Sequence, residues 1–145
     1  MKLPELADMS LYLFRTDYSD DAAWQSCLVV ATKAYDGEDF ESLGAEVTPV
    51  DNPSLEGLTP QQLERLDGND FEFLVADART MRDHTFLVVY NTTTDPADAA
   101  ALMADGISLE PFRVLPEQLE GIVANLSLAN LDFWELAPAD DETRP

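Results

Sequence analysis

Two aspartates stand where predicted buried strands end, and their carboxylates could do chemistry together. Asp17 comes shortly after the apolar run 11–14, and Asp77 closes the apolar run 71–77. If these two strands are parallel neighbours, both side chains leave the carboxyl edge of one sheet, which is where open α/β folds bind ligands. Two carboxylates at that edge could hold Mg²⁺, the one cofactor that this sequence suggests. The pair therefore makes a small metal-assisted enzyme or a ligand-binding domain one hypothesis for the function.

Four basic or titratable side chains lie near these aspartates in the sequence. Arg15, Arg79 and Arg82 could hold an anion beside the metal ion, because a guanidinium pairs with oxyanions through a planar set of donors. His84 could serve as a general acid or base near neutral pH. In the alternative interpretation the two aspartates cap turns and pair with neighbouring arginines, which needs no ligand. We favour this structural alternative, since carboxylates in ion-pair networks are commonly structural.

A second group of candidate residues is acidic and lies in a predicted surface loop. Its five members fall within eleven residues: Asp36, Glu38, Asp39, Glu41 and Glu46. Such a patch could dock a basic protein through electrostatically steered association, as inhibitors and toxin-neutralising proteins do. The alternative is a loop whose charges only face solvent, which is the more common case for any single loop.

The whole chain is strongly acidic. Its 145 residues contain 29 acidic and 8 basic side chains, for a formal net charge of −21. This excess excludes a protein that grips nucleic-acid phosphates, and it argues against anionic membrane surfaces as partners. Averaged over the surface expected for this chain, the charge density is about a third of that of duplex DNA. Mimicry of a nucleic acid would therefore need the acids to gather on one face.

Absent patterns exclude several classes of site and location. One cysteine, Cys27, rules out an internal disulfide and a cysteine-rich zinc site; its place on the apolar face of a predicted helix favours a buried small hydrophobe. The sequence contains none of the common nucleotide-binding or catalytic signatures. No apolar run approaches the ~20 residues of a membrane span, and residues 1–10 lack a signal-peptide pattern. We expect a cytoplasmic protein.

The apolar pattern predicts the elements that position these residues. Strands are expected at 11–14, 46–50, 71–77, 85–91 and 111–115, and helices at 20–35, 59–67, 95–106 and from residue 116 onward. Pro49 favours a position at the edge of the sheet for its strand. Only about seven residues separate the two most apolar strands, too few for a parallel crossover, so we expect these two to be antiparallel or joined by an irregular loop. The order predicts a single α/β domain, residues 1–136, with helices packed on a mixed, mostly parallel sheet of about five strands, followed by a disordered acidic tail, residues 137–145.

Four segments occur in a specific order and spacing. They are R-T-D-Y-S-D-D-A-A-W at 15–24, V-A-D at 75–77, F-R-V-L-P at 112–116 and N-L-S-L-A-N-L-D-F at 125–133. Together they resemble an actinobacterial family of small acidic domains of unknown function, over roughly residues 11–135. The resemblance supports the α/β fold. Because that family brings no established activity, it implies no catalytic residues.

These observations favour an acidic protein-interaction module, such as an inhibitor or immunity-type protein that binds a basic protein surface. No catalytic signature is present, and the charge exceeds what solubility requires. The first alternative is the metal-assisted enzyme or ligand-binding domain that uses Asp17 and Asp77. The second is an inhibitor that mimics nucleic acid. We expect a basic protein as partner, and no direct binding of nucleic acid or membrane.

Overall fold

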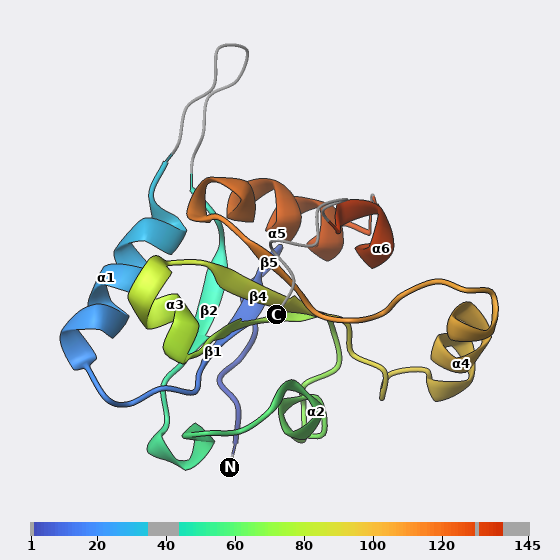
Figure 1. Cartoon of the computed structure of the whole chain (residues 1–145), viewed down its shortest axis with the longest axis horizontal. Helices are drawn as coiled ribbons and strands as arrows, with labels where there is room; N and C mark the ends of the chain where they lie inside the picture. The colour runs from blue at the N-terminus through green and yellow to red at the C-terminus, as the bar shows by residue number, and fades with distance from the viewer. Residues whose placement is uncertain (1, 35–43, 130, 138–145) are drawn as a thin grey trace.

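A five-stranded sheet in the order β2-β1-β3-β4-β5 forms the centre of the structure (Figure 1). The structure is a computed structural model and describes residues 2–34, 44–129 and 131–137. The strands are β1 (Leu11–Arg15), β2 (Val47–Val50), β3 (Phe73–Ala76), β4 (Phe86–Val89) and β5 (Phe112–Val114). β1 pairs in parallel with β2 and with β3, whereas β4 is antiparallel to both β3 and β5.

The sheet confirms most of what the apolar pattern predicts. Five strands form at the expected places, β1 and β3 are parallel neighbours, and β3 and β4 are antiparallel. The strand that contains Pro49 lies at an edge, where a missing N–H costs no ladder hydrogen bond. The expectation of mostly parallel pairing is wrong: two pairs are parallel and two antiparallel, because β4 runs against both of its neighbours.

Helices pack around this sheet and begin at capping residues. The side chain of Asp20 accepts a hydrogen bond from the Ala23 N–H at the start of α1, and Asp95 does the same for α4. None of the helices in the described part of the chain is long and apolar enough to cross a bilayer. The helices are α1 (Asp21–Thr32), α2 (Pro60–Leu63), α3 (Ala78–Asp83), α4 (Pro96–Ala104), α5 (Leu119–Ser127) and α6 (Phe133–Leu136), with 3₁₀ turns η1 (Pro53–Leu55) and η2 (Pro116–Gln118).

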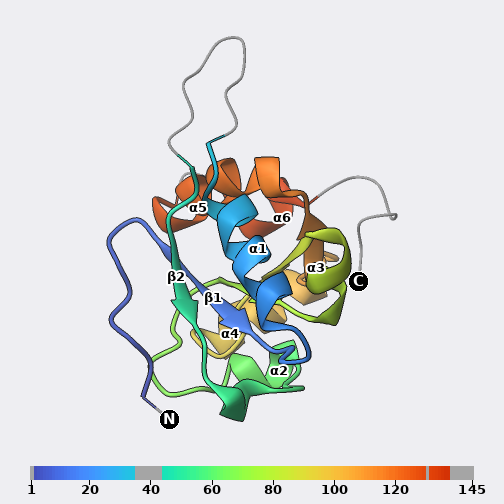
Figure 2. The same cartoon turned by 90° about the vertical axis from the view of Figure 1, so that its left-hand side faces the viewer.

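Apolar side chains fill both faces of the sheet. Side chains alternate along each strand, so that Leu13 faces one core and Phe14 the other. The larger core packs the sheet against α1, α4, α5 and α6, and the smaller one packs it against η1, α2 and the N-terminal segment. Figures 1 and 2 show α5 and α2 on opposite sides of the sheet. Polar side chains next to the strands therefore reach solvent at the two ends of the sheet.

Two predictions concern segments outside the described residues. The acidic loop is described only at its end, where Glu46 is exposed directly before β2; Asp36, Glu38, Asp39 and Glu41 lie outside the described residues. The predicted tail, residues 137–145, is described only at its first residue. The docking role of that loop therefore stays a prediction.

Candidate functional site

The carboxyl edge of β1 and β3 carries the two aspartates that the sequence singles out. The Thr16 N–H donates to the Ala76 carbonyl oxygen at 3.0 Å, which extends the parallel pairing to the ends of both strands. Asp17 and Asp77 then begin separate connections, one to α1 and the other to α3. Their placement at one edge is as predicted, and their partners decide what each carboxylate can do.

Asp77 is held by the first turn of α3 and by a buried arginine. Its carboxylate accepts from the Thr80 N–H at 3.1 Å and from the Thr80 hydroxyl at 3.1 Å, so it caps the helix. From β5, Arg113 donates through both terminal nitrogens to the two carboxylate oxygens, with one contact at 3.1 Å. Burial alone would raise the pKa of Asp77, but the bonds from Arg113 and Thr80 outweigh it and lower the pKa. This ion pair bridges β3 and β5 across β4.

Asp17 serves a local turn instead. Its carboxylate oxygens accept from the N–H of Ser19 at 3.2 Å and from the Ser19 hydroxyl at 3.0 Å. Asp17 and Asp77 thus bind different partners, Ser19 in one case and Thr80 with Arg113 in the other. Within the described part of the chain, no three His, Cys, Asp or Glu side chains lie together in a way that could hold a metal ion.

Arg15 is enclosed at the same edge. Its guanidinium carbon lies 4.2 Å from the ring centre of Tyr18 and 5.5 Å from that of Trp24. Each of its three nitrogens donates: to the backbone oxygen of Asp17 at 2.9 Å, to Asp21 at 2.7 Å and to Asp51 at 3.5 Å. The residue is only 3 % exposed. Arg15 therefore ties the start of α1 and the segment after β2 to the end of β1.

The remaining candidates of this edge lie on α3 or directly after it and are not brought together. Arg79 pairs with Asp83 at 3.1 Å, one helical turn away on the surface. His84 ends the helix in the left-handed conformation, with φ at 61°, and its N–H donates to the Thr80 carbonyl oxygen at 2.8 Å. Arg82 and Asp17 line a cavity of about 320 Å³ that Asp77, Arg15 and His84 do not line.

Cys27 lies fully buried on α1, as predicted for a small apolar residue. Burial raises the pKa of its thiol to about 11, against a weaker opposing effect of Arg15. We expect the native protein to leave this thiol unmodified by a water-soluble disulfide reagent at pH 8, and to release it fully in denaturant. A thiol that reacts at the same rate in both conditions would show that α1 is not packed as described.

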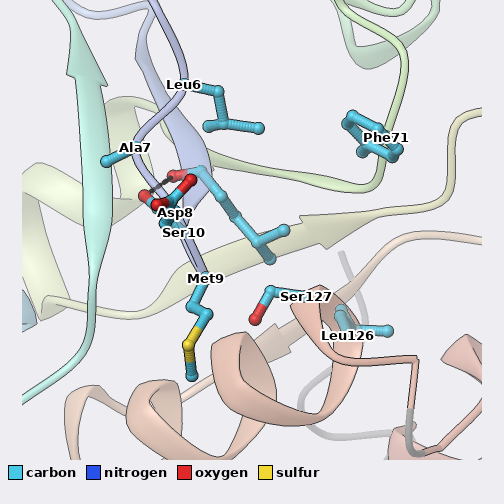
Figure 3. A pocket seen from close by; sticks show the side chains of 9 residues that line it. Leu6, Ala7, Asp8, Met9, Ser10, Phe71, Leu126 and Ser127 are labelled. Atoms are coloured by element: carbon cyan, nitrogen blue, oxygen red, sulfur yellow. Dashed lines mark hydrogen bonds between the residues drawn. The ribbon is translucent and has the colours of Figure 1, made fainter.

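A different site lies at the opposite end of the sheet, where β1 and β3 begin. A cavity of about 320 Å³ opens there and is lined by three acidic and several aromatic side chains. We call it the amino-edge pocket and define it by Glu72, Asp98, Asp132, Tyr90, Phe133 and Trp134. Beside it lies a cavity of about 240 Å³, the apolar groove, lined by Leu6, Met9, Leu11, Phe71 and Leu126 (Figure 3). Phe71 and Leu126 line both cavities, so the two adjoin.

The fold positions the walls of the amino-edge pocket through strand register and aromatic packing. Because Phe73 pairs with Val89, the residues one step further out, Glu72 and Tyr90, flank each other at the ends of β3 and β4. The ring of Phe133 packs 5.5 Å from that of Tyr90 and 4.9 Å from that of Phe112, centre to centre. This packing anchors α6 against the sheet and places the neighbouring Asp132 and Trp134 at the pocket.

The negative charges around the amino-edge pocket act on Glu72 and on Tyr90. Burial raises the pKa of Glu72 above its usual range; a backbone hydrogen bond opposes this shift, and the nearby charge of Asp132 adds to it. Burial also raises the pKa of the Tyr90 hydroxyl, with further contributions from the charges of Asp98, Glu72, Asp95 and Asp132 in that order. None of the described residues that line the pocket is basic. The pocket is therefore a concentrated region of negative potential with aromatic walls.

Sequence reasoning missed this site because its acids come from three distant segments. Glu72 precedes β3, Asp98 belongs to the first turn of α4, and Asp132 precedes α6. A local signal was present in the letters F-E-F at 71–73, where an acidic residue interrupts an otherwise apolar strand. A charge inside such a run indicates a carboxylate held near a buried surface, which is costly without a partner.

The comparisons with known proteins give a family and no activity. No curated protein and no solved structure matches the chain. The chain does match a family described as "Domain of unknown function (DUF6924)" over residues 10–144, which include both edges of the sheet described above. The absence of an assigned activity agrees with what the resemblance in the sequence implies. The chain belongs to the DUF6924 family of domains of unknown function.

Proposed function

We propose that this domain is an acidic protein-interaction module that binds a basic segment of a partner protein at the amino-edge pocket. One observation carries the proposal: the pocket gathers the carboxylates of Glu72, Asp98 and Asp132 around aromatic walls, and no described lining residue is basic. A carboxylate and an aromatic face both attract a cation. An inhibitor or immunity-type protein would use such a pocket to capture a positively charged side chain of its target.

The acids of the pocket have no cationic partner among the described residues, in contrast to four other acids of the chain. An arginine pairs with each of these four acids, which are Asp21, Asp51, Asp77 and Asp83. In the described part of the chain, Glu72, Asp98 and Asp132 form no such pair with an arginine or a lysine. The repulsion between Glu72 and Asp132 is relieved when a cation enters from outside, so part of the stabilisation in the complex comes from removing an unfavourable interaction.

This mechanism makes binding sensitive to salt. Long-range attraction between the acidic domain and a basic partner speeds association, and it is screened beyond about 8 Å at physiological ionic strength.

The carboxyl edge of β1 and β3 is a weaker candidate for a binding site than the amino-edge pocket. Asp17 already accepts two hydrogen bonds there, and Asp77 is bound by Arg113 and Thr80.

The test is a selection from a displayed library of random short peptides on the immobilised full chain. We expect selected peptides to be enriched in arginine and lysine, and to bind about tenfold more weakly when salt rises from about 0.05 to about 0.2 M. The double variant Glu72→Gln/Asp132→Asn should lose these peptides. The contact that Asp132 makes at the start of α6 is its backbone N–H donating to Glu135, and asparagine keeps that N–H.

The matched control is Glu117→Gln/Asp105→Asn, which removes the same two charges from exposed positions that line neither cavity. It should retain the selected peptides. Selected peptides without an excess of positive charge would contradict the proposal, as would equal binding by the two double variants.

A further inference from the structure

The apolar groove gives the amino-edge pocket a neighbour of different chemistry. In Figure 3, Leu6 and Met9 of the N-terminal segment lie across the groove from Phe71 and Leu126. Met9 is 57 % exposed and Phe71 59 % exposed, so two large apolar side chains face solvent at this cavity. A partner segment that places a cation in the pocket therefore also lies beside the apolar groove.

We infer that the partner segment presents an arginine and an apolar side chain on the same face, the arginine entering the amino-edge pocket and the apolar side chain entering the apolar groove. This inference rests on the proposed function and names its ligand. In an extended segment, residues i and i+2 point to the same side and lie about 7 Å apart. Because Phe71 and Leu126 line both cavities, the side chains at positions i and i+2 of the segment can enter the two cavities at the same time.

Arginine fits the pocket better than lysine because of its shape and hydration. Its guanidinium is planar, so one face can stack on Tyr90 or Trp134 while its edge donates to carboxylates. Glu72 and Asp132 both line the pocket, so one guanidinium in it can donate to both carboxylates. An ammonium group is a more strongly hydrated point charge and has no planar face.

The experiment uses the full chain and four capped pentapeptides. The parent is acetyl-Gly-Arg-Gly-Leu-Gly-amide; in the others, citrulline or lysine replaces arginine, or serine replaces leucine. Dissociation constants come from backbone amide shifts in NMR titrations. We expect citrulline, a neutral analogue of arginine, and serine each to weaken binding about tenfold, and lysine to weaken it severalfold.

Two variants of the protein assign each preference to its cavity. Glu72→Gln should abolish the preference for arginine over citrulline and keep the preference for leucine over serine. Met9→Asn should do the reverse; asparagine suits this position because Met9 is left-handed, with φ at 56°. Glu117→Gln should change neither preference.

The outcomes separate this inference from the proposed function. If arginine and lysine peptides bind more tightly than the citrulline peptide but leucine and serine bind alike, the paired ligand is wrong and the basic-segment proposal stands. Lysine binding as tightly as arginine would overturn the assignment of arginine. Equal binding of the arginine and citrulline peptides would overturn both proposals.

Discussion

Replacing Asp77 with asparagine is expected to lower the free energy of unfolding by about 3–5 kcal/mol, because it leaves the charge of Arg113 buried without a counterion. Arg113 is 5 % exposed, and both of its terminal nitrogens donate to the carboxylate of Asp77. The capping bond to Thr80 weakens less, since asparagine also caps helices. The measurement is denaturant unfolding at pH 7, followed by circular dichroism.

Two further variants make this prediction specific. Asp17→Asn should cost less than about 1 kcal/mol, because the Asp17 carboxylate bonds to Ser19 in an exposed turn. Adding Arg113→Met to Asp77→Asn should recover part of the loss by removing the unpaired charge. If Asp77→Asn costs no more than Asp17→Asn, the ion pair is not structural, and the carboxylate is free to bind a ligand.

The same ion pair predicts the response of stability to acid. The pKa of Asp77 is lowered in the folded state, so its contribution is present above the unfolded pKa of about 3.9. That contribution is lost as pH falls below this value through the lowered folded pKa. The gap in stability between the wild type and Asp77→Asn should therefore close as the pH falls through this range.

Unlike Asp77→Asn, the variant Glu72→Gln is expected to raise the free energy of unfolding. It should also weaken the binding of a basic peptide. The ionised carboxylate of Glu72 is desolvated and lies near the charge of Asp132, so its removal should raise the free energy of unfolding at pH 7 by about 1 kcal/mol. The same change should weaken binding of a basic peptide about tenfold, since a charge-assisted contact is lost. A residue that lowers stability and supports binding is the signature of a functional position.

The pH dependence of the free energy of unfolding shows why Glu72→Gln is more stable than the wild type. Because the folded pKa of Glu72 is raised, the cost of its charge is absent below the unfolded pKa of about 4.3 and develops as pH rises through the folded value. The stabilisation by Glu72→Gln should follow this course, whereas Glu117→Gln should show no such pH-dependent gain. A loss of stability in Glu72→Gln at pH 7, or unchanged peptide binding, would contradict the assigned role.

Much of the fold could be predicted because its signals are local. The central strands are continuous apolar runs, Pro49 marks an edge strand, and acidic caps precede α1 and α4. The helix α3 was not predicted, since six residues are too few to show an apolar period; a capping box between Asp77 and Thr80 sets its start. The short connection between β3 and β4 predicted that these two strands are antiparallel. The apolar run of β5 carried no such signal of its direction, so the share of parallel pairs was overestimated.

The candidate site was harder to predict because it depends on contacts between distant segments. Sequence reasoning placed Asp17 and Asp77 at one edge but missed Arg113, which lies 36 residues from Asp77. A charged residue between the apolar Phe112 and Val114 was the available signal of a buried ion pair. At the amino edge, the strand register and the packing of α6 bring together acids that are far apart in the chain.

The two tryptophans allow the most direct test of the amino-edge pocket as a cation-binding site. Trp134 lines the pocket, while Trp24 is buried in the core beneath Arg15. In an NMR titration with N-acetyl-arginine amide, the indole N–H signal of Trp134 should shift progressively, that of Trp24 should stay in place, and the Glu72→Gln variant should require about tenfold more ligand. A Trp134 signal that does not move, or that moves equally with the citrulline analogue, would contradict the account.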